Sequence, residues 1–150
     1  MIRIVSTLFA LFVSLNTLAG IDTQTDDNGV ILAGHDAVAY FTDNKPVMGK
    51  AEFTAVYQGA IYRFSSAENR NTFNQNPQQY APAYGGYCST CTSFGKKFEV
   101  NGKAFKIVDG QLFVNKNEEI HAFWLKDVAG NIVKADNNWP EIKHVPADEL

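Results

Sequence analysis

Short runs that alternate apolar and polar residues dominate the first half of the chain. The segments 52–57 and 60–64 are rich in aromatic and β-branched residues, and only Gln58 and Gly59 separate them. Two such runs joined by two turn-forming residues indicate a β-hairpin. The pattern therefore predicts an antiparallel pair of strands over 52–64.

A helix is predicted directly after this hairpin. Ser65 is a residue type that caps helix N-termini, and Glu68 lies three positions later, which completes a capping box. Pro77 is expected to end the helix, because the residue before a proline disfavours helical backbone angles.

The second half of the chain contains two strong turn signals. The segments 97–100, 103–108 and 111–114 are separated by Asn101-Gly102 and by Asp109-Gly110. Both dipeptides suit the tight turns of hairpins. These three segments therefore predict a short β-meander.

Helical spacing returns in the last third of the chain. Ile120, Phe123 and Trp124 recur with the helical period, which predicts a helix over 118–127 and a second one over about 129–137. The predicted fold class is α+β, in a small single domain. A β-hairpin and helix are followed by a short β-meander and C-terminal helices.

The first twenty residues have the parts of a secretory signal peptide. Arg3 gives a basic start, residues 4–15 are apolar, and Thr17 and Ala19 place small residues near a cleavage position. The apolar run is shorter than the roughly 20 residues that a membrane span needs. We expect cleavage after this leader and an exported protein, periplasmic or secreted, with no membrane anchor.

Composition agrees with one globular domain and excludes several functions. The 150 residues are 45% hydrophobic, and the net charge of −3 becomes −4 when Arg3 is lost with the leader. An acidic chain without a basic patch is not suited to nucleic acid. The sequence also has no evident hydrolase triad, carboxylate pair or Gly-rich phosphate loop.

Both cysteines, Cys88 and Cys91, lie in the aromatic and Gly-rich segment 80–95. Three roles are open for this pair. The first is a structural disulfide, which suits an exported protein. The second is a metal site for Cu(I), or for Zn(II) with His35 or His121 as a further ligand, and it requires reduced thiols. The third is a redox-active dithiol at the start of a short helix over 88–94.

The histidines and aromatic residues also have simpler interpretations. His35 lies in a turn, where a capping or surface role is common, and His121 lies among apolar residues of a predicted helix. His144 lies in the tail, where exposure to solvent is expected. The many Tyr and Phe side chains are expected to form the core, although they could also line a pocket.

Several motifs resemble the YHS domain family, and in particular its small exported members. They are Gly34-x-Asp36-x-Val38-Ala39-Tyr40-Phe41, Tyr57-x-Gly59-x-x-Tyr62-x-Phe64-Ser65-Ser66-x-x-Asn69-Arg70, Phe73-x-x-x-Pro77-x-x-Tyr80-x-Pro82 and Tyr84-Gly85-Gly86-Tyr87-Cys88. The likeness continues to Trp139-Pro140 and covers about residues 34–142.

The resemblance also implies what this chain lacks. The metal-associated branch of the family, found beside heavy-metal transport ATPases, has cysteines at the positions of Ala39, Ser65 and Asn69. None of these three residues supplies a soft anionic ligand, so the inherited metal site is expected to be absent. Cys88 matches the exported branch, whereas Cys91 departs from it. The resemblance implies no established reaction.

These observations predict one exported domain with four segments. They are a signal peptide over 1–19, a flexible lead-in over 20–33, a YHS-like domain over 34–142 and a tail over 143–150. The first functional hypothesis is a non-catalytic module that binds copper or zinc. The candidate metal ligands are Cys88, Cys91, His35 and His121. The alternatives are a thiol redox protein that uses the same pair, or an accessory domain with a structural disulfide.

Overall fold

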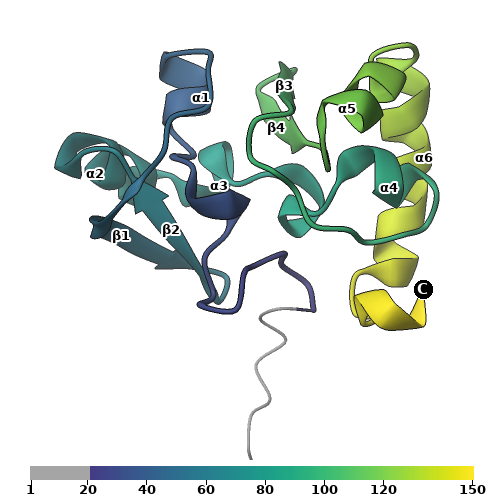
Figure 1. Ribbon diagram of the computed structural model, residues 1–150, viewed down its shortest axis with the longest axis horizontal. Helices are drawn as coiled ribbons and strands as arrows, with labels where there is room; N and C mark the ends of the chain where they lie inside the picture. Colours follow the sequence, from purple (N-terminus) through teal and green to yellow (C-terminus); the bar gives the residue numbers. More distant parts are fainter. Residues whose placement is uncertain (1–20) are drawn as a thin grey trace, which may run out of the picture.

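The computed structural model describes residues 21–150, in which two halves lie side by side, each with one two-stranded antiparallel sheet (Figure 1). The elements of the first half are η1 (Leu32–Gly34), α1 (Ala39–Thr42), β1 (Lys50–Tyr57), β2 (Ala60–Phe64), α2 (Ala67–Gln75) and α3 (Pro77–Tyr80). Those of the second half are η2 (Ala83–Gly86), α4 (Ser89–Ser93), β3 (Phe105–Val108), β4 (Gln111–Val114), α5 (Glu118–Trp124), α6 (Val128–Ile142) and η3 (Ala147–Glu149). The predicted α+β class is confirmed.

The predicted signal peptide over 1–19 lies outside the described residues. Within residues 21–150, no helix has the length and apolar character that crossing a bilayer requires.

The first hairpin forms as predicted. Gln58 and Gly59 have φ angles of 48° and 78°, and both values are left-handed. Two consecutive left-handed residues give the type I′ turn, whose twist matches that of the strands it joins. Tyr57 of β1 consequently pairs with Ala60 of β2.

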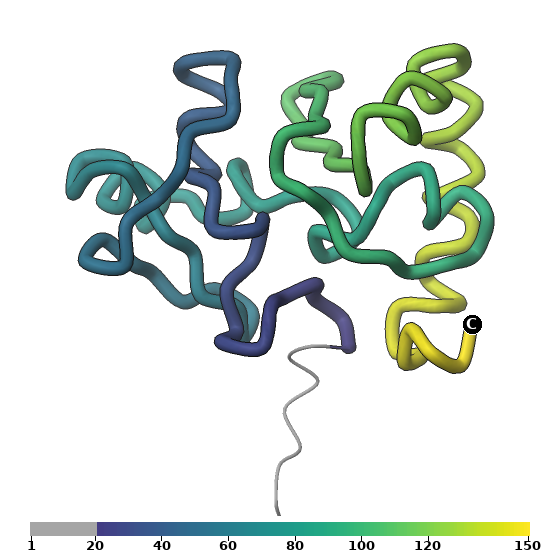
Figure 2. The backbone as a smooth tube through the Cα atoms, in the orientation of Figure 1, coloured from purple at the N-terminus to yellow at the C-terminus, as the bar shows by residue number. Residues whose placement is uncertain are grey.

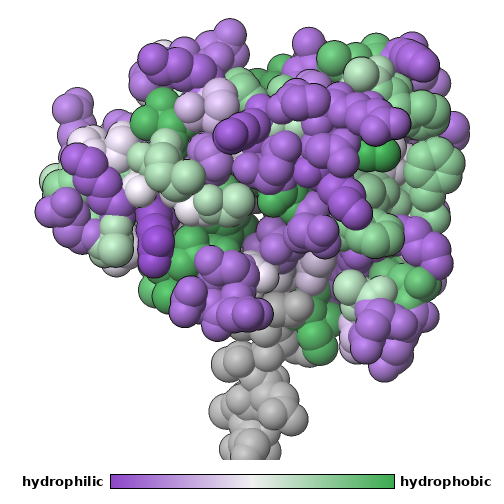
Figure 3. Space-filling view, viewed as in Figure 1, coloured by the Kyte–Doolittle hydropathy of each residue, from purple (hydrophilic) through white to green (hydrophobic). Residues whose placement is uncertain are grey.

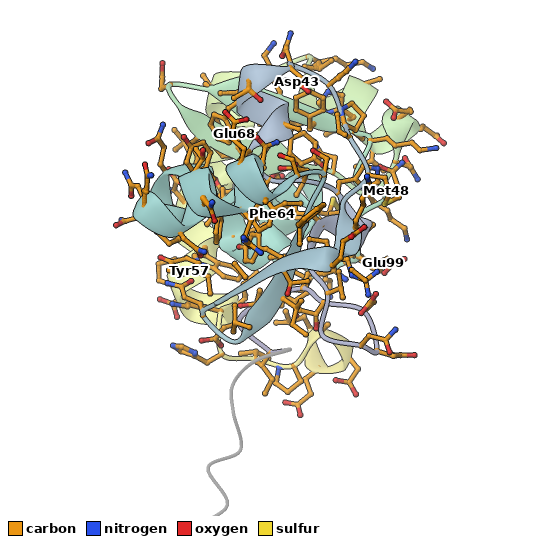
Figure 4. All side chains as sticks on the ribbon, turned by 90° about the vertical axis from the view of Figure 1, so that its left-hand side faces the viewer. Asp43, Met48, Tyr57, Phe64, Glu68 and Glu99 are labelled. Carbon is orange, nitrogen blue, oxygen red and sulfur yellow. A yellow bond between two sulfur atoms is a disulfide. The ribbon has the colours of Figure 1, made fainter. Side chains whose placement is uncertain are left out.

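Aromatic side chains fill the space between this hairpin and α2. Phe64 and Phe73 are fully buried, with ring centroids 5.1 Å apart, and Phe73 lies 4.5 Å from the ring of Tyr62. Figure 4 shows Phe64 at the centre of this half, with Asp43 and Glu68 towards the edge. These aromatic residues are the core, as expected.

The helix after the hairpin begins one residue later than predicted. Ser66 is its N-cap and accepts a hydrogen bond from the backbone N–H of Asn69. Ser65 instead donates its hydroxyl and its backbone N–H to the Asp36 carboxylate. The capping box based on Ser65 was therefore wrong, because a distant buried carboxylate takes both donors of that serine.

Only two of the three predicted meander strands form. Asp109 and Gly110 make the left-handed turn of the β3–β4 hairpin, with φ angles of 51° and 76°. At the other predicted turn, the side chain of Asn101 accepts from the backbone N–H groups of Lys103 and Ala104. These two hydrogen bonds make the backbone change direction at Asn101. Residues 97–100 therefore do not pair as a strand of this sheet.

The last residues of the segment predicted as a flexible lead-in over 20–33 are part of the core. Val30, Ile31 and Leu32 are at most 2% exposed, and the N–H of Ile31 donates to the carbonyl of Ile61 in β2. Figure 2 shows residues 21–30 running along the lower side of the molecule from the second half to the first. The lead-in prediction failed because this apolar run adds to the edge of β2.

The C-terminal helix is longer than predicted. Helix α6 continues through Pro140 to Ile142, beyond the expected end near residue 137. The indole of Trp139 lies 6.0 Å from the ring of Tyr84 and 6.2 Å from that of Tyr87. This packing fixes the last turn despite the proline.

Lys97 forms hydrogen bonds with residues near both ends of the described chain. Its side-chain ammonium donates to the carbonyl oxygens of Ile21, Lys143 and Val145 at 2.7 to 2.8 Å, and it lies 4.9 Å from the ring of Tyr87. Lys97 is only 3% exposed. Burial lowers the pKa of this ammonium, and the charge of Asp22 opposes that shift.

We expect Lys97→Met to reduce the free energy of unfolding by roughly 3 kcal/mol, because three carbonyl groups lose a charged donor. Urea unfolding would measure this change. Lys103→Met, at an exposed lysine of the same loop, is the matched control and should have little effect. Equal unfolding midpoints for the two variants would contradict the role assigned to Lys97.

Candidate functional site

The backbone before the cysteine pair follows an unusual path. Tyr84, Gly85 and Gly86 all have positive φ angles, of 53°, 60° and 82°. A Cβ atom on Gly85 would overlap the carbonyl oxygen of Asp22, so only glycine allows the N-terminal segment to approach this closely. The Gly-Gly pair thereby directs the chain into α4 at Cys88.

Cys88 and Cys91 are joined by a disulfide at the start of α4. Cys88 is the N-cap of this helix, and its sulfur accepts the backbone N–H of Cys91 at 3.2 Å. Cys88 is fully buried, whereas Cys91 is only partly buried. The two sulfur atoms therefore differ in their access to solvent.

A buried amide, that of Asn115, lies behind the disulfide. Its Oδ1 accepts the backbone N–H of Thr90 at 2.9 Å and the Thr90 hydroxyl at 2.8 Å. The same oxygen lies 3.8 Å from the sulfur of Cys88. Asn115 is completely buried and follows β4, so the second hairpin positions this amide against α4.

His121 contacts the other end of the Asn115 amide. Because Oδ1 faces Thr90, Nδ2 of Asn115 faces Nδ1 of His121, at 3.0 Å. An amide nitrogen only donates, so Nδ1 accepts and the proton of the neutral imidazole is on Nε2. Burial lowers the pKa of His121, Glu118 opposes this shift and Lys106 adds to it.

An open apolar pocket of about 300 Å³ lies beside Cys91. Its lining residues come from α4, from the loop after it and from α5. They are Thr90, Cys91, Phe94, Lys96, Phe98, Ile120 and Phe123. Sequence reasoning missed this pocket, because residues from these separate segments have no common motif.

The four candidate metal ligands do not form one cluster. His121 is linked to the cysteine pair through Asn115, whereas the ring of His35 donates from Nδ1 to the carbonyl of Leu32. Across residues 21–150, no three His, Cys, Asp or Glu side chains are arranged to hold a metal ion. Metal binding by this set stays a prediction.

The three positions that carry cysteine in the metal-associated branch lie together around Asp36. The carboxylate of this fully buried residue accepts the N–H of Ala39, the N–H and hydroxyl of Ser65, and the side-chain amide of Asn69. This chain therefore places a hydrogen-bonded carboxylate among positions that have no thiolate.

The lowered pKa of His121 predicts how stability changes with pH. Below pH 6.5 the unfolded chain binds a proton that the folded imidazole resists, so the free energy of unfolding should fall as pH falls through 6.5. We expect His121→Gln to weaken this dependence while keeping an acceptor for Asn115. Urea midpoints above and below pH 6.5 would measure it.

His144→Gln, at a largely exposed histidine, is the control, and it should retain the part of the pH dependence that belongs to His121. An unchanged pH dependence in His121→Gln would contradict the burial argument.

One comparison with known proteins gave a match, and it lies mostly in the first half of the molecule. The model of the YHS domain family matches residues 38–84, from the start of α1 into η2. Neither a comparison with curated proteins nor one with solved structures gave a match. The matched range ends before Cys88, so the cysteine pair lies outside it. Residues 38–84 of this chain are a YHS domain.

Proposed function

We propose that this protein is an exported YHS-domain module that exchanges thiols and disulfides through Cys88 and Cys91. The observation that carries the proposal is the unequal exposure of the pair, with Cys91 beside an open pocket and Cys88 buried at the N-cap of α4. The signal-peptide pattern over 1–19 favours a compartment in which such a pair is oxidised.

The exchange begins at Cys91, the more accessible residue of the pair. A partner thiolate attacks Cys91, a new bond joins the partner sulfur to Cys91, and the Cys88–Cys91 bond breaks. The electron pair leaves on Cys88, which then takes up one proton. A second thiol of the partner displaces Cys91 from the mixed disulfide. The partner is oxidised by two electrons, and the module is reduced to a dithiol.

Two groups suit Cys88 to the role of leaving sulfur. The N–H of Cys91, at 3.2 Å, stabilises negative charge on Cys88 while the bond breaks. Oδ1 of Asn115, at 3.8 Å, is an acceptor for the thiol proton of reduced Cys88. His121 orients this amide from its other end.

Titration of the free thiols in buffers of defined redox potential tests the proposal. We expect a reversible change between no free thiol and two, at a potential of about −120 to −270 mV, the range of thiol-exchange proteins. A potential below about −300 mV would instead mark a structural disulfide. The Cys88–Cys91 disulfide closes a very short loop. By the chain-entropy argument it therefore adds only about 2 kcal/mol to the free energy of unfolding.

Single serine variants separate the roles of the two sulfurs. Cys91 in Cys88→Ser should be alkylated at least 10-fold faster than Cys88 in Cys91→Ser, because only Cys91 lines the pocket. The double serine variant is the control for non-specific labelling. Equal alkylation rates would contradict the proposed direction of attack.

Binding of a soft metal by the reduced pair is a second candidate function. It is favoured by the adjacency of the two sulfurs, since two neighbouring thiolates suit Cu(I). We expect the reduced protein to bind one equivalent of Cu(I), seen by mass spectrometry without oxygen, and Cys91→Ser to lose it. His121→Gln should retain copper but weaken Zn(II) binding, and His35→Gln is the matched comparison for the other candidate ligand. No copper adduct on the reduced protein would contradict this candidate.

A further inference from the structure

We propose that the pocket beside Cys91 binds a cysteine-containing segment of a partner protein, with an aromatic or branched aliphatic residue next to the cysteine and acidic residues around it. The inference rests on the proposed thiol exchange and names its substrate class. Three observations support this class of partner: the apolar pocket, the lysines around it and the accessible position of Cys91.

Three exposed aromatic side chains gather at the pocket. Phe94, Phe98 and Phe123 are 64%, 42% and 45% exposed, and the rings of Phe94 and Phe123 lie 6.0 Å apart. On the face seen in Figure 3, hydrophilic residues separate several apolar groups. Exposed aromatic residues that line a concave surface are typical of binding sites.

Three lysines lie around this surface, although the whole chain is acidic. Lys96 lines the pocket, the ammonium of Lys116 lies 4.6 Å from the ring of Phe98, and that of Lys126 lies 5.9 Å from the ring of Phe123. Glu99 approaches Lys116 only to 3.9 Å, in an exposed pair that contributes little. An acidic partner segment complements these three lysines.

The size of the pocket limits what it holds. A volume of about 300 Å³ is at the lower end of ligand sites, and it accommodates one large side chain rather than a long lipid chain. Because Cys91 is part of the lining, a side chain bound there brings the neighbouring cysteine of its own chain to the disulfide. The partner is therefore a protein segment that supplies both an apolar anchor and a thiol.

Formation of the mixed disulfide between Cys91 of the oxidised, full mature chain and matched peptides, with release of the Cys88 thiol, tests this inference. One peptide has Phe beside its cysteine and Glu residues around them, a second has Gly in place of Phe, and a third has Lys in place of Glu. We expect the first peptide to react at least 10-fold faster than either of the others. Dithiothreitol, which has no anchor, measures the intrinsic reactivity of the disulfide.

Variants of the pocket should change this selectivity. Phe123→Ala should remove the preference for the Phe peptide, and Lys126→Glu should remove the preference for the acidic one, with each peptide rate expressed relative to the rate of the same variant with dithiothreitol. Val56→Ala is the matched control, since Val56 is 73% exposed on β1. Phe94→Ser, at a residue that is 64% exposed, replaces Phe123→Ala if that variant does not fold.

The outcomes distinguish the docking inference from the proposed thiol exchange. Equal rates for the three peptides, or unchanged selectivity in the Phe94 and Phe123 variants, would overturn the docking inference and leave thiol exchange standing. Failure of dithiothreitol to reduce the folded protein would overturn both. A version of the first peptide with Ser in place of Cys should still bind, as a chemical-shift change at the pocket, and absence of binding would overturn the docking inference.

Discussion

The buried amide of Asn115 connects the parts of the molecule on which its chemistry depends. One end of this amide holds the first turn of α4 through Thr90, and the other end holds His121 of α5. Its oxygen also faces the sulfur of Cys88. Since an amide has both donors and acceptors, it satisfies these different partners without adding a buried charge. The second hairpin thus acts as the support of the cysteine pair.

The two halves of the molecule divide their roles. In the first half, the positions that carry metal-binding cysteines in a related branch surround the carboxylate of Asp36, and each of them donates a hydrogen bond to it. That arrangement stabilises the YHS domain and leaves no soft ligand there. The cysteines of this chain lie in the second half, beyond the matched range. The cysteine pair and the range that the family model matches therefore belong to different parts of the chain.

The sequence predicted elements whose cause is local. The hairpin at Gln58-Gly59 formed because both turn residues adopt the left-handed conformation that their types tolerate. The helix start was displaced from Ser65 to Ser66 because a carboxylate 29 residues away binds Ser65. The third strand of the meander was lost because the side chain of Asn101 bonds to its own loop. Distant or side-chain partners of this kind leave no periodic signal.

The candidate site followed the same rule. The closeness of Cys88 and Cys91 was readable from their spacing, but the apolar pocket and the contact of Asn115 with His121 required the tertiary fold. Lys97, in a charged pair of lysines, gave no sign that it would be buried.

The hydrogen bonds of Lys97 also bear on the order in which parts of the chain meet during folding. Its ammonium joins Ile21, at the beginning of the described chain, to Lys143 and Val145 near its end. These contacts join residues 46 to 76 positions apart in the sequence, so Lys97 stays without them until distant parts of the chain have met. Local elements such as the first hairpin can form earlier, because their partners are close in sequence. The burial of this one cation therefore requires residues from both ends of the described chain.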